Sequence, residues 1–217
     1  MKYKNKPKFI VHTMKQGTPE WDEIRKAKIT ASVASKMITP TGKPSVQADG
    51  YIGTLLAEAA GLQDPEPIPQ TYWVERGSDL EKEARKWLQV RLNAPVHECG
   101  FIESPDGLSG FSPDGYVVED GYLIPVELKV PKPSTHINWF IGGSLPNDHK
   151  GQVHFAIERT GAPYSYFMSY NPMLTPLLVK VPRDDYTESV GLALAAFTAK
   201  MNDARIALFG NETEEAA

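Results

Sequence analysis

The sequence is poor in cysteine, and this scarcity excludes several kinds of covalent and metal site. Cys99 is the only cysteine among 217 residues, so an intramolecular disulfide is impossible. A zinc or iron–sulfur site built on four cysteines is excluded for the same reason. A chain without a disulfide suits a reducing compartment, and we expect a cytoplasmic location.

Long apolar runs and an excess of positive charge are also missing. No stretch approaches the roughly 18 apolar residues of a membrane-spanning helix, so we expect no membrane partner. Four lysines lie near the N-terminus, but no apolar run follows them, so we expect that this segment is not a secretory signal. The net charge of −4 argues against a protein that coats DNA with a basic surface. It is compatible with an enzyme that concentrates positive charge in one channel.

The length and composition fit one folded unit of α/β class. A chain of 217 residues with 41% hydrophobic content can bury a single core. We expect one domain over residues 1–209 and an acidic tail over 210–217. Periodicity predicts helices beginning at Thr18 and over 30–38, 49–60, 71–92, 146–160 and 184–208, and strands within 95–130, 164–170 and 177–181. Residues 131–143 are expected to form a loop with at most one helical turn.

The triplet Glu127-Leu128-Lys129 is the most informative short pattern. Residues 111–118 and 122–130 are predicted to be adjacent strands joined by a turn at 119–121. Side chains at i and i+2 share one face of a strand, so Glu127 and Lys129 should point the same way. Asp114 on the neighbouring strand would then lie close to Glu127.

These residue types suit the hydrolysis of a phosphodiester. Hard oxygen ligands favour Mg²⁺, for which Mn²⁺ can substitute, and Asp114, Glu127 and the backbone carbonyl of Leu128 could hold one such ion. Lys129 would position or deprotonate the attacking water, or stabilise the charge of the transition state. The alternative interpretation is a surface hairpin whose Asp, Glu and Lys form a weak salt bridge.

Glu81 lies within the apolar stripe of the predicted helix at 71–92. At 100° per residue, it shares this stripe with four apolar side chains, namely Val74, Ala84, Leu88 and Leu92. An unpaired buried carboxylate is costly, so Glu81 should have a partner. The partner is either Arg85, at position i+4, or the metal site, where Glu81 would be a third acidic group that could hold a second ion. Gly77 would leave room for the close approach that the second alternative needs.

With these motifs in view, the sequence resembles the phage lambda exonuclease / YqaJ viral recombinase family, a branch of the PD-(D/E)xK nucleases. The resemblance runs from about residue 14 to 205. Its motifs, in chain order, are Gln16-Gly17-Thr18-Pro19-Glu20-Trp21 with Arg25 and Ile29-Thr30-Ala31-Ser32, then Gly77-x(3)-Glu81-x(2)-Ala84-Arg85, Ser112-Pro113-Asp114-Gly115, Glu127-Leu128-Lys129, Gly151-Gln152-Val153-His154, and 166–172. The resemblance implies a restriction-endonuclease-like core with a central mixed β-sheet flanked by helices.

The resemblance also implies a pocket for a 5′-phosphate beside the metal site. The matching positions here are Arg25, Ser32, Ser112 and Gln152. A guanidinium group, two hydroxyls and an amide can together saturate a terminal phosphate. The simpler alternatives are a solvated helix face for Arg25, a helix start for Ser32 and a core amide for Gln152.

Further expectations concern the assembly and the partners that this family implies. Its members form a ring-shaped homotrimer around DNA, and a phage-type single-strand annealing protein would be the natural partner. The strand-separating wedge would lie in residues 72–76, at Trp73 or Val74. The resemblance also implies a phage or prophage gene expressed in a bacterial cell.

The expected activity is therefore that of a Mg²⁺-dependent 5′-to-3′ exonuclease. It would digest one strand of double-stranded DNA from a 5′-phosphorylated end and leave a 3′ overhang for recombination. Its expected catalytic residues are Glu81, Asp114, Glu127 and Lys129. Two alternatives stay open: an endonuclease of restriction or repair type on the same core, and a non-catalytic module that binds DNA ends.

Overall fold

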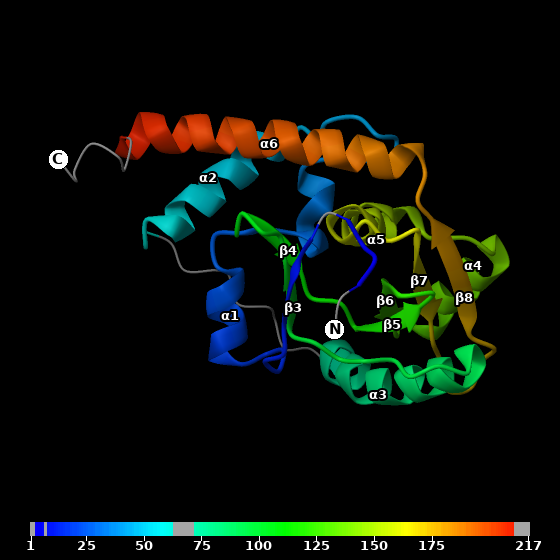
Figure 1. Cartoon of the computed structure of the whole chain (residues 1–217). Helices are drawn as coiled ribbons and strands as arrows, with labels where there is room; N and C mark the ends of the chain where they lie inside the picture. The colour runs from blue at the N-terminus through cyan, green and yellow to red at the C-terminus, as the bar shows by residue number, and fades with distance from the viewer. Residues whose placement is uncertain (1–2, 7, 63–71, 211–217) are drawn as a thin grey trace.

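The strands form two separate four-stranded sheets rather than the single central sheet predicted above. The computed structural model describes residues 3–6, 8–62 and 72–210, and within the third range it describes side chains from residue 80 onward. Figure 1 shows the chain, with helices above and below the strands. Of the expected acidic tail at 210–217, only Gly210 lies within the described residues.

The smaller sheet is built from short strands that lie far apart in the sequence. Its order is β1-β3-β4-β2, with β1 and β4 antiparallel to β3, and β2 parallel to β4. Its strands are β1 (Ile10–His12), β2 (Ile29–Thr30), β3 (Phe101–Glu103) and β4 (Ser109–Phe111). The sheet therefore ties the N-terminal segment to the middle of the chain.

The larger sheet has the order β5-β6-β7-β8 and is mixed. Its strands are β5 (Gly115–Glu119), β6 (Tyr122–Lys129), β7 (Tyr164–Ser169) and β8 (Leu177–Pro182). β5 and β6 form the predicted hairpin, β6 and β7 are parallel, and β7 and β8 are antiparallel. The parallel pairing sets Glu127 opposite Phe167 and Lys129 opposite Ser169.

Helices cover both faces of the larger sheet, as the resemblance implied. The helices are α1 (Pro19–Arg25), the 3₁₀ helix η1 (Ala31–Lys36), α2 (Ala48–Ala59), α3 (Tyr72–Leu92), α4 (Pro133–Gly142), α5 (Asn147–Thr160) and α6 (Asp185–Phe209). Ala84 and Leu88 of α3 are buried with Leu128 on one face of the sheet, while α5 buries Val153 against Phe167 on the other. Figure 1 shows α6 lying across α5 and α2, away from α3.

The strand predicted over residues 111–118 is wrong as a single element. β4 ends at Phe111 and β5 begins at Gly115, and the two strands belong to different sheets. Pro113 lies in the break, where its lack of a backbone N–H prevents a continuous ladder. The break lets one run of chain serve both sheets.

The loop predicted over residues 131–143 is also wrong, because Pro133–Gly142 form the ten-residue helix α4. Pro133 occupies the first turn, where its missing N–H costs nothing, and Gly143 ends the helix with φ of 61°. The two residue types that suggested a loop are therefore the boundary signals of a helix.

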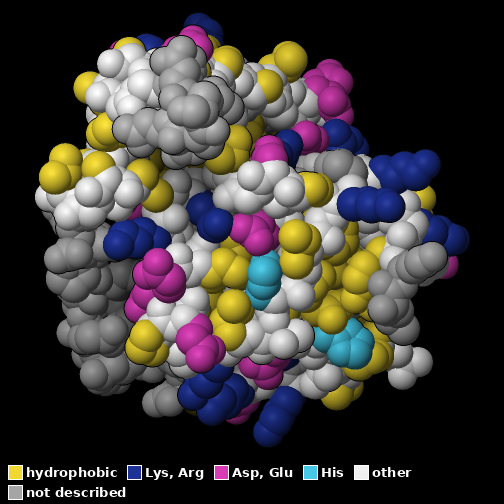
Figure 2. Space-filling model, turned by 60° about the vertical axis from the view of Figure 1, so that its left-hand side comes forward, with side chains coloured by type: hydrophobic (Ala, Val, Ile, Leu, Met, Phe, Trp, Pro, Cys, Tyr) yellow, Lys and Arg dark blue, Asp and Glu magenta, His cyan; other side chains and the backbone are white. Residues whose placement is uncertain are grey.

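Charges on the face shown in Figure 2 are mixed. Acidic side chains are interspersed with basic ones over its centre, while basic side chains gather along its right-hand and lower edges. This distribution agrees with a chain whose net charge is only −4.

Within the part of the chain that the structure describes, no helix is both long and apolar enough to span a membrane.

Gly161 provides a test of this architecture. It ends α5 with φ of +60°, and a Cβ atom there would lie 1.6 Å from the carbonyl oxygen of Lys6. We expect Gly161→Ala to lower the free energy of unfolding by at least about 2 kcal/mol, because alanine adds left-handed strain and a backbone clash. Urea denaturation measures the change.

The matched control is Gly53→Ala within α2, where a Cβ atom meets nothing within 4 Å. Alanine is the better helix former by roughly 1 kcal/mol, so this variant should be at least as stable as the parent. Equal stability of the two variants would contradict the placement of the N-terminal segment against α5.

Candidate active site

The site begins where the chain passes from the smaller sheet to the larger one. Asp114 lies just before β5, and its Oδ2 accepts a hydrogen bond of 2.7 Å from the backbone N–H of Leu128. Leu128 lies between Glu127 and Lys129 on β6. This single bond therefore holds the carboxylate of Asp114 beside the Glu-Leu-Lys triplet.

Arg85 of α3 fixes the same junction from the other side. Its Nε and Nη2 donate to the backbone carbonyl of Asp114 at 3.1 and 2.9 Å, and its Nη1 lies 2.8 Å from Glu98. The sequence offered Arg85 as the simpler partner of Glu81. The hydrogen bonds and the ion pair of Arg85 are instead made with Asp114 and Glu98. Glu81 is half-buried, and its strongest charge interactions are with Asp114 and then Lys129.

Glu127 and Lys129 form an ion pair on the same face of β6. The ammonium group of Lys129 contacts Oε1 of Glu127, whose side chain is buried. Apart from this ion pair, Oε1 of Glu127 has no hydrogen-bond partner among the described residues. A buried pair of this kind does not fit the alternative of a plain surface hairpin.

All three carboxyl groups of the cluster have raised pKa values, chiefly because they are buried. Burial raises the pKa of Glu127 to about 7, and the charges of Asp114 and Glu81 add to the rise. Burial, followed by the charge of Asp114, raises the pKa of Glu81 to about 7 as well. The pKa of Asp114 is also raised, chiefly by burial, although Lys129 and the Leu128 N–H oppose the shift.

Lys129 is the cation that responds to these carboxylates. Burial lowers the pKa of its ammonium group, but the charges of Glu127, Asp114 and Glu81 outweigh burial and raise this pKa above its ordinary value. Lys129 is therefore protonated at neutral pH. A protonated lysine can stabilise negative charge or orient water, but it cannot act as the initial base.

The oxygen-rich cluster has the chemistry that a hard divalent cation needs. Among the described residues, Lys129 is the one partner of the buried Glu127 Oε1, and three carboxyl groups with raised pKa values surround this lysine. Among the described residues, no three Asp, Glu, His or Cys side chains converge closely enough to hold an ion by side chains alone. An ion here would therefore be held by one or two carboxylates, with its other ligands supplied by waters or by a backbone oxygen such as the predicted Leu128 carbonyl.

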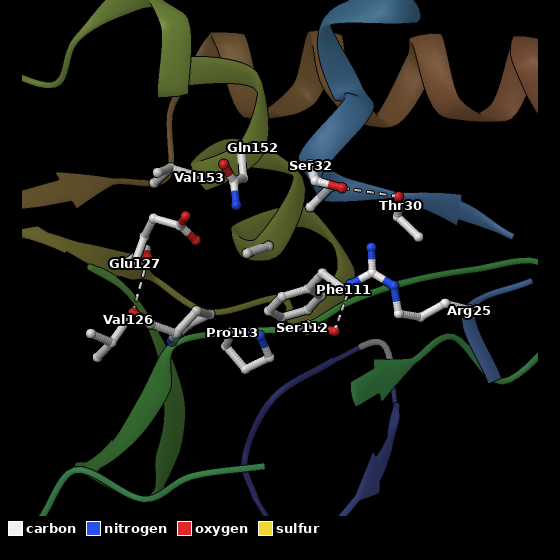
Figure 3. Close-up of a pocket in the computed structure, with 14 residues that line it drawn as sticks. Arg25, Thr30, Ser32, Phe111, Ser112, Pro113, Val126, Glu127, Gln152 and Val153 are labelled. Atoms are coloured by element: carbon white, nitrogen blue, oxygen red, sulfur yellow. Dashed lines mark hydrogen bonds between the residues drawn. The ribbon is translucent and has the colours of Figure 1, made fainter. Parts of the chain in front are cut away.

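A pocket next to this cluster brings together the four residues expected at a 5′-phosphate. Arg25, Ser32, Ser112 and Gln152 all line it, and Glu127 lines it too. Figure 3 shows Gln152 above the pocket with its amide nitrogen pointing inward, Glu127 at one end and Arg25 at the other. The residues come from α1, η1, the break after β4, α5 and β6, so only the folded chain assembles them.

Sequence reasoning missed two residues of this region. Trp21 of α1 belongs to the first family motif but was given no role in the pocket, and its Nε1 donates to the hydroxyl of Ser112 at 2.8 Å. Its spacing of four residues from Arg25 was the available signal. His149 of α5 lies near Lys129, and burial, followed by the charge of Lys129, lowers its pKa to about 4. The spacing of His149 three residues before Gln152 on one helix face was the signal in that case.

Two further sequence-based expectations concern the start of α3. Trp73 and Val74 were candidates for a strand-separating wedge, and Gly77 was expected to leave room beside Glu81. The side chains of Trp73 and Val74 and the surroundings of Gly77 lie outside what the structure describes, so both expectations stay predictions.

A family model covers the region of the chain that holds the carboxylate cluster and the pocket. It is described as the YqaJ-like viral recombinase domain, and it matches residues 20–163. The chain belongs to this family. The match includes Trp21 and Arg25 of α1, the break at 112–114 and the Glu127-Leu128-Lys129 triplet. No curated protein sequence matches the chain.

Solved structures agree with this family assignment. The alkaline exonuclease LHK-Exo from Laribacter hongkongensis is 26% identical, with a TM-score of 0.74 over 88% of this chain and 96% of that one. The same enzyme in complex with dAMP is 27% identical, with a TM-score of 0.72 and the same coverage. A phage-related exonuclease from Haemophilus somnus 129PT shares the fold at 11% identity, with a TM-score of 0.60 over 84% of this chain and 97% of that one.

The raised pKa of Glu127 predicts a pH-dependent stability without metal. The folded state holds this proton up to about pH 7, while the ordinary value is 4.5, so Glu127 lowers the free energy of unfolding as pH rises between these values. We expect the stability of Glu127→Gln relative to the parent to increase from pH 4 to pH 8 in EDTA, because the variant lacks this ionisation. Urea denaturation at both pH values measures the difference.

Added Mg²⁺ should raise the thermal unfolding midpoint of the parent at pH 8 and have a smaller effect on Glu127→Gln. The exposed Glu20 of α1 provides the control, since Glu20→Gln should behave as the parent does. The account of the cluster would be contradicted if the free energies of unfolding of the parent and of Glu127→Gln differed by the same amount at pH 4 and at pH 8.

Proposed function

We propose that the chain is a Mg²⁺-dependent exonuclease that digests one strand of duplex DNA from a 5′-phosphorylated end. Digestion in the 5′-to-3′ direction would leave a 3′ single-stranded overhang for recombination. The observation that carries this proposal is the shared wall of the two subsites: Glu127 belongs to the carboxylate cluster and also lines the pocket of Arg25, Ser112 and Gln152. A strand whose terminal phosphate is held there has its first phosphodiester next to the cluster.

The proposed chemistry divides between a bound ion and the protein. Mg²⁺, or Mn²⁺ in its place, would lower the pKa of a bound water and neutralise charge on the scissile phosphate, with Asp114, Glu127 and the Leu128 carbonyl as its holders. Lys129, protonated because of its carboxylate neighbours, stabilises charge at the reacting phosphate. Glu81, with its pKa near 7, is able to exchange a proton at neutral pH or to help hold a second ion.

The pocket explains why a chain end would be the preferred substrate. A guanidinium group and an inward-pointing amide nitrogen offer hydrogen bonds that suit a terminal phosphate with its extra charge. The similarity to the alkaline exonuclease LHK-Exo, which has been solved in complex with dAMP, supports a DNA substrate. The family assignment supports a role in recombination.

The proposal extends to assembly and partners by family analogy. A single domain over residues 1–209 would form a ring-shaped homotrimer around DNA. A phage-type single-strand annealing protein would load onto the overhang, in the cytoplasm of the bacterial host.

Substrate topology tests the proposal against an endonuclease on the same core. We expect rapid digestion of a linear duplex with Mg²⁺, and no cutting of a covalently closed circle, because a circle offers no terminal phosphate. Lys129→Ala should lower the turnover rate on the linear duplex by at least about a hundredfold, as losses of transition-state charge stabilisation do.

The exposed Lys43 supplies a matched control, since Lys43→Ala should retain the parental rate. Rapid cutting of the intact circle would favour the endonuclease. A parent protein that binds DNA ends but shows no hydrolysis with Mg²⁺ or Mn²⁺ would favour the non-catalytic module.

The terminal phosphate tests the pocket. We expect the parent to digest 5′-phosphorylated ends faster than 5′-hydroxyl ends, and Arg25→Ala to reduce that preference by about tenfold or more, since a charge-assisted contact is lost. Steady-state kinetics on both ends measure the ratio. Equal rates of the parent on the two kinds of end would overturn the proposed role of Arg25, Ser32, Ser112 and Gln152.

A further inference from the structure

Trp21 lies against both charged and polar walls of the pocket. Its indole N–H is shared between the hydroxyl oxygen of Ser112 at 2.8 Å and the carbonyl oxygen of Gly100 at 3.0 Å. The guanidinium carbon of Arg25 lies 4.0 Å from the centre of the Trp21 ring. Both side chains come from α1, four residues apart, so they share one helix face.

The Ser112 hydroxyl oxygen accepts two hydrogen bonds. One comes from Trp21 Nε1, and the second comes from Arg25 Nη1 at 3.1 Å. A serine hydroxyl has two acceptor sites and one hydrogen to donate. Both acceptor sites are therefore filled, and the Ser112 O–H can act only as a donor.

The donor direction matters because of what else faces the pocket. Figure 3 shows a guanidinium nitrogen of Arg25 pointing toward the side where Ser32 and Thr30 lie, and the amide nitrogen of Gln152 pointing inward. With Ser112 fixed as a donor, the walls opposite Glu127 present N–H and O–H groups. Such a wall favours a ligand rich in acceptors, and a terminal phosphate dianion donates no hydrogen bond.

We propose that Trp21 is a positioning residue that fixes the Ser112 hydroxyl as a donor to the 5′-terminal phosphate and holds the Arg25 guanidinium flat against its ring. This inference rests on the proposed function. Trp21 touches no reacting atom itself and acts through Ser112 and Arg25.

The indole is suited to both tasks in a way that other aromatic side chains are not. Phenylalanine retains a face for the guanidinium but has no N–H, so the Ser112 oxygen would regain a free acceptor site. An acceptor aimed at a phosphate oxygen is repulsive. Burial also lowers the pKa of Arg25, which marks a site where little water competes for its contacts.

The experiment compares Trp21→Phe, Ser112→Ala and the double variant. The steady-state rate constants and KM on linear duplexes with 5′-phosphate or 5′-hydroxyl ends give the phosphate preference of each protein. We expect Trp21→Phe to reduce this preference by about tenfold through KM, equivalent to the loss of one charge-assisted hydrogen bond. When Ser112→Ala is already present, Trp21→Phe should reduce the phosphate preference by less than about threefold. The hydroxyl that Trp21 positions is then absent.

Two controls separate positioning from damage to the fold. Trp87→Phe makes the same change in α3, outside the pocket, and should leave the phosphate preference unchanged. Calorimetric binding of dAMP and of deoxyadenosine to each protein gives a readout without turnover. Trp21→Phe should weaken the binding of dAMP by about tenfold and should change the binding of deoxyadenosine by less than about threefold.

Three outcomes would overturn the inference. In the first, Trp21→Phe shows the same phosphate preference as the parent. This outcome would overturn the role of Trp21 and leave the proposed function intact. The second is an equal loss of preference in the presence and absence of Ser112, which would make Trp21 a general structural residue. The third is a parent without any phosphate preference, which would overturn the role of the whole pocket as well.

Discussion

The hydrogen bond from the Leu128 N–H to the Asp114 carboxylate is the contact on which the rest of the site depends. At 2.7 Å it joins the crossing between the two sheets to the strand that carries Glu127 and Lys129. Arg85 secures the same crossing through the Asp114 carbonyl. The break that starts at Ser112 and leads into β5 therefore serves both subsites, since Ser112 faces the pocket and Asp114 faces the cluster.

Electrostatic imbalance follows from this geometry. Burial and mutual repulsion raise the pKa values of Glu81 and Glu127 to about 7, and the same charges keep Lys129 protonated. Ionisable groups with shifted pKa values cluster at functional sites, because catalysis needs pKa values that differ from those of free side chains. Holding such groups close together and buried lowers the stability of the folded protein. On our account, a divalent cation relieves the imbalance, and a phosphate bound by Arg25 places the substrate next to it.

Sequence alone could predict the groups that depend on local periodicity. Period-two alternation gave the β5–β6 hairpin with its Glu127 and Lys129, and the helical stripe gave Glu81. It could not predict the division into two sheets, since β1 and β2 find their partners about 80 to 90 residues further along the chain. The turn-forming run Ser112-Pro113-Asp114-Gly115 was the local sign of the break. The link from Trp21 to Ser112 was hidden as well, because it joins residues 91 positions apart.

The most direct test follows the fate of each strand. A linear duplex with 5′-phosphate ends, labelled at either the 5′ or the 3′ end of one strand, is incubated with the protein with and without Mg²⁺. Our account predicts immediate release of the 5′ label as a mononucleotide, with the 3′ label retained in shortening strands until late, and no release without the ion. Early release of the 3′ label, or release of the 5′ label in EDTA, would contradict it.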